Sequence, residues 1–144
     1  AVRGRQHQNP NASVAPIKAL LVTSDLTVQA ESALRTGAAL ARAVGAELHV
    51  FHCLPARGGG HGRLRLAQAE DQLRVQVHRI VNEEAVPLRI TVAAGTPAEQ
   101  INRRAADVGA GLVILGPHKP RPHPGPFTTT TADRVIRSSP IPCL

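Results

Sequence analysis

The sequence is poor in aromatic residues and has no methionine. Of its 144 residues two are Phe, and none is Trp, Tyr or Met. Stacking of unpaired bases depends on aromatic side chains, so this scarcity argues against a binding platform for single-stranded nucleic acid. The hydrophobic share of 42% is carried mainly by Ala, Val, Leu and Ile. Such an aliphatic core suits a parallel sheet covered by helices.

Cysteine is also scarce, with only Cys53 and Cys143. Two cysteines do not make a disulfide framework, and no spacing resembles a set of zinc ligands. We therefore expect a reducing, cytoplasmic setting and no metal site. The sequence has no apolar run near 18 residues and no charged-then-apolar leader, so we expect neither a membrane span nor a secretory signal.

Acidic residues are fewer than basic ones. Seventeen Lys and Arg against ten Asp and Glu give a net charge of +7, which favours acidic partners such as nucleotides or nucleic acids. The arginines are scattered over every expected helix and loop, without a dense run. This distribution is typical of a solvated basic surface, and nucleic-acid binding is the less favoured alternative.

The length fits one domain. Residues 1–15 are polar and without periodicity, which predicts a mobile tail followed by a single domain over residues 16–144. Within it, apolar strand-like runs alternate with helical patterns, as in an α/β layered fold. The expected strands cover residues 17–22, 47–54, 88–93 and 112–115, with a fifth beginning at 141. The expected helices run from 27 to about 44, from about 66 to 84, from 96 to 108, and around 132–136.

Several of these helices carry start and stop signals. Thr27 is a fair N-cap for the first helix, and Gly45 ends it. Thr96, Pro97 and Glu99 form the pattern of a full capping box, and the glycines at 109 and 111 end that helix. The last helix is expected to bury three apolar residues: Ala132, Val135 and Ile136.

The stretch 112–144 has the pattern of a phosphate site. A short apolar strand ends at Gly116, a proline-rich basic loop follows, and a run of threonines precedes a helix. In parallel sheets ligands bind outside the carboxyl ends of the strands, where the first amides of the next helix point. Thr129, Thr130 and Thr131 would supply hydroxyls and amides there, with Thr130 and Asp133 spaced as cap and third residue.

The sequence shows no catalytic apparatus. His52 and Cys53 could suggest a nucleophile and its base, but neighbours on a strand point to opposite faces of the sheet. No carboxylate pair, metal-ligand cluster or activated nucleophile is visible. We therefore expect a protein that is not an enzyme, with no catalytic and no metal-binding residues.

Three short motifs resemble those of the universal stress protein family. Their positions are Val22, Asp25 and Thr27 for V-x-x-D-x-[ST]; Val92, Gly95, Pro97 and Ile101 for V-x-x-G-x-P-x-x-x-I; and Gly116, Lys119, Thr129 and Thr130 for G-x2-G-x9-G-[ST]. The order of elements from residue 17 to 144 also agrees with one such domain.

The resemblance implies an open five-stranded parallel sheet of order 3-2-1-4-5 with helices on both faces, Rossmann-like and similar to the adenine nucleotide alpha hydrolases. It also implies that Asp25 faces a bound adenosine and that Cys53 packs beside the adenine. The nucleotide-facing residues carried over from the family are Thr23, Ser24, Asp25, Cys53, Leu115, Gly116, His118, Lys119, Thr129, Thr130 and Thr131.

Two glycines of the third motif are replaced, by Lys119 and Thr129. Glycine lets backbone amides approach phosphates closely, and a Cβ crowds that approach. Five prolines between 117 and 126 also remove amide donors from the loop, whereas Lys119, Arg121, His118 and His123 add positive charge. We therefore expect a degenerate adenine-nucleotide cleft in a stress-response interaction module. The alternative is a switch that binds ATP or AMP with Mg in the same cleft.

The resemblance also implies a homodimer, because the last strand of the family often lies at the subunit interface. The protein partners of such a dimer are not encoded in any recognisable motif.

Overall fold

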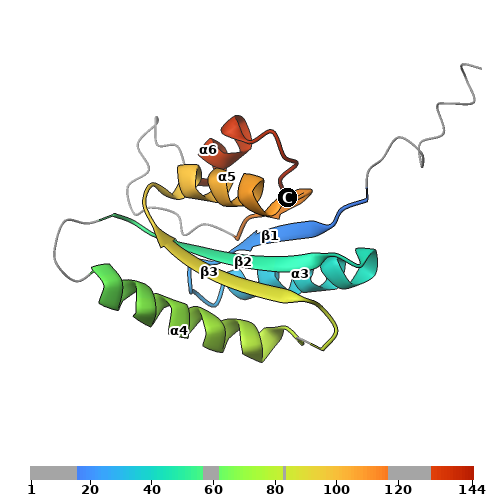
Figure 1. The fold of residues 1–144 in the computed structure, drawn as a ribbon, viewed down its shortest axis with the longest axis horizontal. Coiled ribbons are helices and arrows are strands. Elements are labelled where there is room, and N and C mark those ends of the chain that lie inside the picture. Colours follow the sequence, from blue (N-terminus) through green and yellow to red (C-terminus); the bar gives the residue numbers. More distant parts are fainter. Residues whose placement is uncertain (1–15, 57–61, 83, 117–130) are drawn as a thin grey trace, which may run out of the picture.

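The computed structural model describes residues 16–56, 62–82, 84–116 and 131–144, which form a sheet between two layers of helices (Figure 1). The predicted tail over residues 1–15 and the loop 117–130, with its candidate residues His118, Lys119, Thr129 and Thr130, lie outside this described part of the chain. Among the described helices, none is long and apolar enough to cross a membrane.

Four strands make a parallel sheet of order β3-β2-β1-β4. Their bounds are Ala19–Thr23 for β1, Glu47–Leu54 for β2, Leu88–Ala94 for β3 and Leu112–Ile114 for β4. The central strand β1 is buried on both faces, as its continuous apolar run predicts. The chain moves outward from β1 through β2 to β3 and then returns to the other side of β1 for β4. This reversal places the topological switch point between β1 and β4.

Helices cover both faces, as expected (Figure 1). Helices α3 (Ala30–Val44) and α4 (Gly62–Ile80) enclose one hydrophobic cluster, which contains Leu34 and Leu73. Helices α5 (Pro97–Val108) and α6 (Thr131–Ser138) enclose a second cluster on the opposite face, which contains Phe51. Alternate residues of β1 enter alternate clusters, as the period of a strand requires.

The fifth strand is present only as a bridge. Val113 pairs in parallel with Cys143, on the side of β4 away from β1. The Val113 amide donates to Pro142 O at 2.9 Å, and the Leu144 amide donates to Val113 O at 2.8 Å. The predicted order 3-2-1-4-5 is therefore confirmed for its first four strands, and the segment from Ile141 occupies the fifth position. Prolines 140 and 142 lack amide hydrogens, which limits a longer ladder.

The predicted start of α3 was wrong, whereas α5 begins at Pro97 after Thr96 as predicted but without the expected cap hydrogen bond. Helix α3 begins at Ala30 with Gln29 as N-cap, because the Thr27 hydroxyl donates instead to the Asp25 carboxylate. The capping box at α5 does not form: Thr96 is the N-cap but makes no side-chain cap hydrogen bond. Its side chain is exposed, so water can reach the first amides of the helix. Both predicted glycine stops are correct, since Gly45 and Gly109 adopt left-handed conformations, with φ of 70° and 65°.

Helix α4 is shifted relative to its prediction. It begins at Gly62 and ends at Ile80. Its C-terminal end is set by Asn82, whose side-chain oxygen accepts from the Glu84 amide at 3.0 Å in a tight turn.

In α6, Val135 is fully buried but Ile136 is 57% exposed, so the prediction that Ile136 is buried was wrong. This short helix packs on α5 alone among the described helices, which leaves one apolar side chain outside the contact.

Candidate functional site

Polar groups gather where β1 and β4 end, at the switch point of the sheet. The Gly116 amide, just after β4, donates to Thr23 Oγ1 at the end of β1 at 3.4 Å. A Cβ built on Gly116 would lie 3.4 Å from Thr23 O and 3.8 Å from Ala30, at the start of α3. The ends of β1 and β4 and the start of α3 are therefore brought together at one point. In open parallel sheets this is where ligands bind.

Asp25 projects from the loop that follows β1. It is exposed, and its Oδ1 accepts a hydrogen bond from the Thr27 amide at 2.9 Å and another from the Thr27 hydroxyl. This is an Asx turn, which is the structural role that a short polar residue has after a strand. An ionised carboxylate only accepts hydrogen bonds, so Asp25 would recognise a donor group on a ligand.

Ser24 is turned away from this point and is used entirely within the fold. Its amide donates to Phe51 O at 2.9 Å, and its carbonyl lies 2.7 Å from Nδ1 of His52. Because a carbonyl can only accept, Nδ1 of His52 must carry the proton. The Ser24 hydroxyl donates to Oε1 of Gln76 at 2.6 Å and accepts from the Leu26 amide at 3.0 Å. Of the two neighbours in the predicted site, Asp25 is thus available to a ligand and Ser24 supports the loop.

Cys53 lies at the end of β2, half-buried on the face covered by α5 and α6. Its Sγ is 3.6 Å from Gly95 O, and burial raises the pKa of the thiol above its ordinary value. The thiol is therefore protonated near neutral pH, which is the opposite of an activated nucleophile. Leu115 is also partly buried and packs against the same hydrophobic cluster.

The His52 ring is buried and bonded to Ser24 O, whereas the Cys53 side chain packs with the cluster on the opposite face of the sheet. The two side chains do not form a nucleophile and base pair. Within the described ranges, no group of three or more His, Cys, Asp and Glu side chains is arranged to hold a metal ion.

The structure thus brings Thr23 and Gly116 together, and Asp25 lies in the loop that follows Thr23, whereas Cys53 and Leu115 pack against the cluster under α5 and α6. Thr131 begins helix α6. The other threonines and the lysine that were predicted to face the nucleotide lie outside the described residues: Lys119, Thr129 and Thr130. The described part of this region offers the exposed carboxylate of Asp25 as an acceptor, close in the chain to Thr23, which accepts from the Gly116 amide. The part that would hold phosphates falls on residues 117–130.

The sequence analysis missed one residue of this region, Gln76. It lies on the buried stripe of α4, in register with Leu73, Val77 and Ile80, and is 7% exposed. A polar residue in an apolar stripe must find hydrogen-bond partners when it is buried. The polar Gln76 within the apolar stripe of α4 was therefore the one feature of the sequence that indicated its role.

The comparisons with known proteins agree with this fold. A model of the universal stress protein family matches residues 16–144. Among curated proteins, no sequence matches significantly. A universal stress protein from Archaeoglobus fulgidus is 25% identical, with a TM-score of 0.71 over 88% of this chain and 91% of that one.

Two other similar structures contain nucleotides. A universal stress protein in complex with cAMP is 16% identical, with a TM-score of 0.65 over 90% of this chain and 96% of that one. A universal stress protein from Archaeoglobus fulgidus in complex with dAMP is 20% identical, with a TM-score of 0.58 over 90% of this chain and 98% of that one. The family match covers nearly the whole described fold, so this chain belongs to the universal stress protein family.

Proposed function

We propose that this domain binds an adenine nucleoside monophosphate between the ends of β1 and β4, and that it is a regulatory protein rather than an enzyme. The observation that carries the proposal is the contact of Thr23 with Gly116 at the switch point of the sheet, with the exposed Asp25 in the loop that follows Thr23. Two similar proteins are in complex with cAMP and dAMP, which supports the same class of ligand here.

A monophosphate suits this chain better than ATP. Lys119 and Thr129 stand where the family has glycines, and prolines remove amide donors between 117 and 126. Fewer backbone donors favour a ligand with fewer phosphate groups, which Lys119 can still bind as a point charge. Magnesium, which accompanies triphosphates, is then less important to binding.

Asp25 is assigned to the adenosine end of the ligand. Its carboxylate can accept from the adenine amino group or from a ribose hydroxyl. Thr23 and Gly116 line the floor between the two strands, and Cys53 and Leu115 are assigned to the apolar contact with the base. His118, Lys119 and the threonines at 129, 130 and 131 are assigned to the phosphate end.

The test is a binding titration by calorimetry and thermal melt with AMP, 2′-deoxy-AMP, inosine monophosphate and ATP. At 100 times its Kd a ligand stabilises the fold by about 2.7 kcal/mol, which raises the Tm by roughly 5–10 °C. We expect AMP to bind at least as tightly as ATP. If inosine monophosphate alone fails to bind, Asp25 is assigned to the amino group of the base. If 2′-deoxy-AMP alone fails to bind, Asp25 is assigned to the ribose.

Asp25→Asn is the decisive variant, because the amide oxygen can still accept from the Thr27 amide and preserve the Asx turn. It removes the charge that receives the ligand. Asp71→Asn on α4 is the matched control, since Asp71 is exposed and lies outside the candidate site. If millimolar AMP moves neither the wild-type melt nor the calorimetric signal, the cleft is degenerate and the domain acts through protein partners alone.

We also propose that the domain acts as a homodimer in the cytoplasm. Ile136 and Leu144 are 57% and 64% exposed in the C-terminal segment that pairs with the edge of the sheet. Cys53 and Cys143 are both free thiols, as is usual in a reducing compartment. Sedimentation equilibrium measures the mass in solution, and Ile136→Asp should shift a dimer toward the monomer. A monomer at all concentrations contradicts this proposal.

A further inference from the structure

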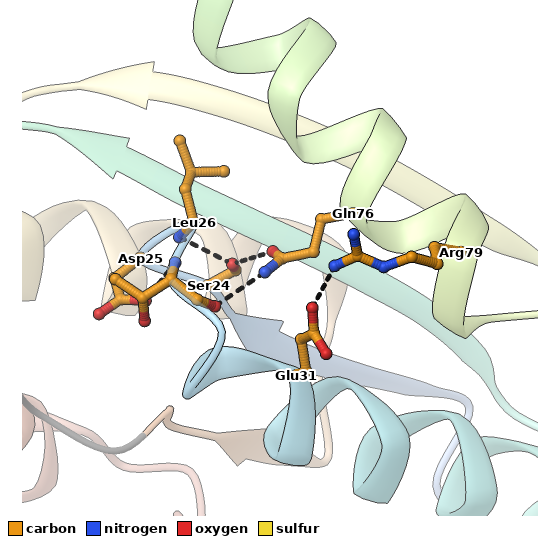
Figure 2. Close-up of polar contacts among 7 residues, drawn as sticks. Ser24, Asp25, Leu26, Glu31, Gln76 and Arg79 are labelled. Atoms are coloured by element: carbon orange, nitrogen blue, oxygen red, sulfur yellow. Dashed lines mark hydrogen bonds and ion pairs between the residues drawn. The ribbon is translucent and has the colours of Figure 1, made fainter.

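The loop that carries Asp25 is held from a distance by one buried amide. Gln76 reaches from α4 to two points of the loop between β1 and α3 (Figure 2). Its Oε1 accepts from the Ser24 hydroxyl at 2.6 Å, and its Nε2 donates to Thr27 O at 2.9 Å. The two contacts bridge 52 and 49 residues of sequence. Because Gln76 is 7% exposed, water cannot easily replace either bond.

The residues between these two anchors are Asp25 and Leu26. Leu26 has a φ of 68°, and among the described residues it is the single non-glycine in this left-handed region. Side chains with a Cβ rarely adopt this conformation, so the surrounding structure must hold it. Two hydrogen bonds stabilise this conformation. The Leu26 amide donates to Ser24 Oγ at 3.0 Å, and the Ser24 hydroxyl donates in turn to Gln76. Gln76 thus stabilises a turn that the loop would not prefer by itself.

The turn determines where Asp25 points. Its carboxylate lies on the side of the loop away from Gln76 and is exposed (Figure 2). Gln76 does not contact that carboxylate in any described hydrogen bond, so it would act on a ligand only through the loop.

We propose that Gln76 is a positioning residue, which sets the affinity of the site by fixing Asp25 in its ligand-facing orientation. This inference rests on the proposed function. A preorganised loop loses less conformational freedom when a ligand binds, so affinity falls when the anchor is removed. Helix α4, which lies on the opposite face of the sheet from α5 and α6, is thereby coupled to the ligand site.

The test compares Gln76→Met with Gln72→Met. Methionine has nearly the shape of glutamine but cannot form these hydrogen bonds, and Gln72 is exposed on the same helix. We expect Gln76→Met to raise the Kd for AMP about tenfold, because the ligand must then order the loop when it binds. Gln72→Met should leave the Kd unchanged. Hydrogen exchange of the Leu26 and Thr27 amides should accelerate in Gln76→Met and stay unchanged in Gln72→Met.

A merely structural role predicts a different result in a double-mutant cycle. If Gln76 acts through Asp25, then Gln76→Met should add little to the loss already caused by Asp25→Asn. Additive losses would overturn the proposal. Equal AMP affinity in wild type and a folded Gln76→Met would also overturn it while leaving the proposed function intact.

Two further outcomes are distinguishable. If wild type does not bind AMP, the proposed function fails, and unchanged exchange of the Leu26 and Thr27 amides in Gln76→Met would refute the positioning role as well. If Gln76→Met does not fold, Ser24→Ala removes one of the two Gln76 contacts from the loop side. Exchange of the Thr27 amide, which donates to Asp25, should then be faster and AMP affinity lower, and no change in both overturns the proposal.

Discussion

Gly37 allows α3 to lie unusually close to the sheet. A Cβ built on Gly37 would lie 2.2 Å from Cγ2 of Val22 and 3.3 Å from Cδ1 of Leu48. Real contacts between carbon atoms are optimal at about 3.5–4.0 Å. The change Gly37→Ala therefore forces a methyl group into space that Val22 already fills.

The core offers little room for Val22 to move. Its side chain is fully buried in the central strand, and a β-branched residue has few alternative rotamers. Overpacking of this kind destabilises by about 1–3 kcal/mol, and the short distance places this site at the upper end of that range. Alanine regains about 1 kcal/mol of helix propensity relative to glycine. We expect a net loss of about 2 kcal/mol, or a Tm lowered by roughly 5 °C.

Urea unfolding measures this loss directly, and the midpoint should fall by about 1 M at a typical slope. The control is Val22→Ala combined with Gly37→Ala, because the smaller residue at 22 makes room for the new methyl. The double variant should be more stable than the sum of the two single losses by about 1–3 kcal/mol. Strict additivity, or a Gly37→Ala protein as stable as wild type, would refute the close approach of α3 to β1.

Substitutions at three other positions test separate features of the structure. Burial raises the pKa of Cys53, so the folded state loses stability as the pH rises from the ordinary thiol pKa toward the raised value. Thermal melts at alkaline pH should show this loss in the wild type and not in Cys53→Ala. Gly45 has a φ of 70° and open space around its Cα, so Gly45→Ala should cost about 1 kcal/mol and Gly45→Asn less, by urea unfolding. The ion pair between Arg79 and Glu31 is largely exposed on the Arg79 side, so Arg79→Gln should change stability by less than about 1 kcal/mol, and salt should reduce that effect.

The sheet was predictable because its information is local and strong. Strand β2 over Glu47–Leu54 matches its prediction, and the other strands differ from theirs by one or two residues. Continuous apolar runs separated by helical patterns leave few alternatives to a parallel sheet with helices on both faces. The glycine stops at 45 and 109 were equally readable, since each needs a left-handed backbone that other residues avoid.

The candidate site was predictable only in part. Its expected location follows from the ends of the strands, where Thr23 contacts Gly116 and the loop with Asp25 begins. The choice between a residue that faces a ligand and one that supports a loop depends on contacts with distant segments. Ser24 illustrates this, because its hydroxyl is taken by a glutamine 52 residues away.

The wrong N-cap of α3 has the same origin as the role of Gln76. Thr27 is a good cap by its chemistry, but its hydroxyl donates to Asp25 and its carbonyl accepts from both Gln76 and the Ala30 amide. Hydrogen bonds from α4 and from within the loop thus outweigh the local preference, and the N-cap moves from Thr27 to Gln29. Local rules fail most readily where a nonlocal contact imposes a strained turn, and Leu26 at a φ of 68° lies at that point. The failure of the local rule thus has a structural cause, the contacts that hold the strained turn at Leu26, and it falls on the loop that carries Asp25.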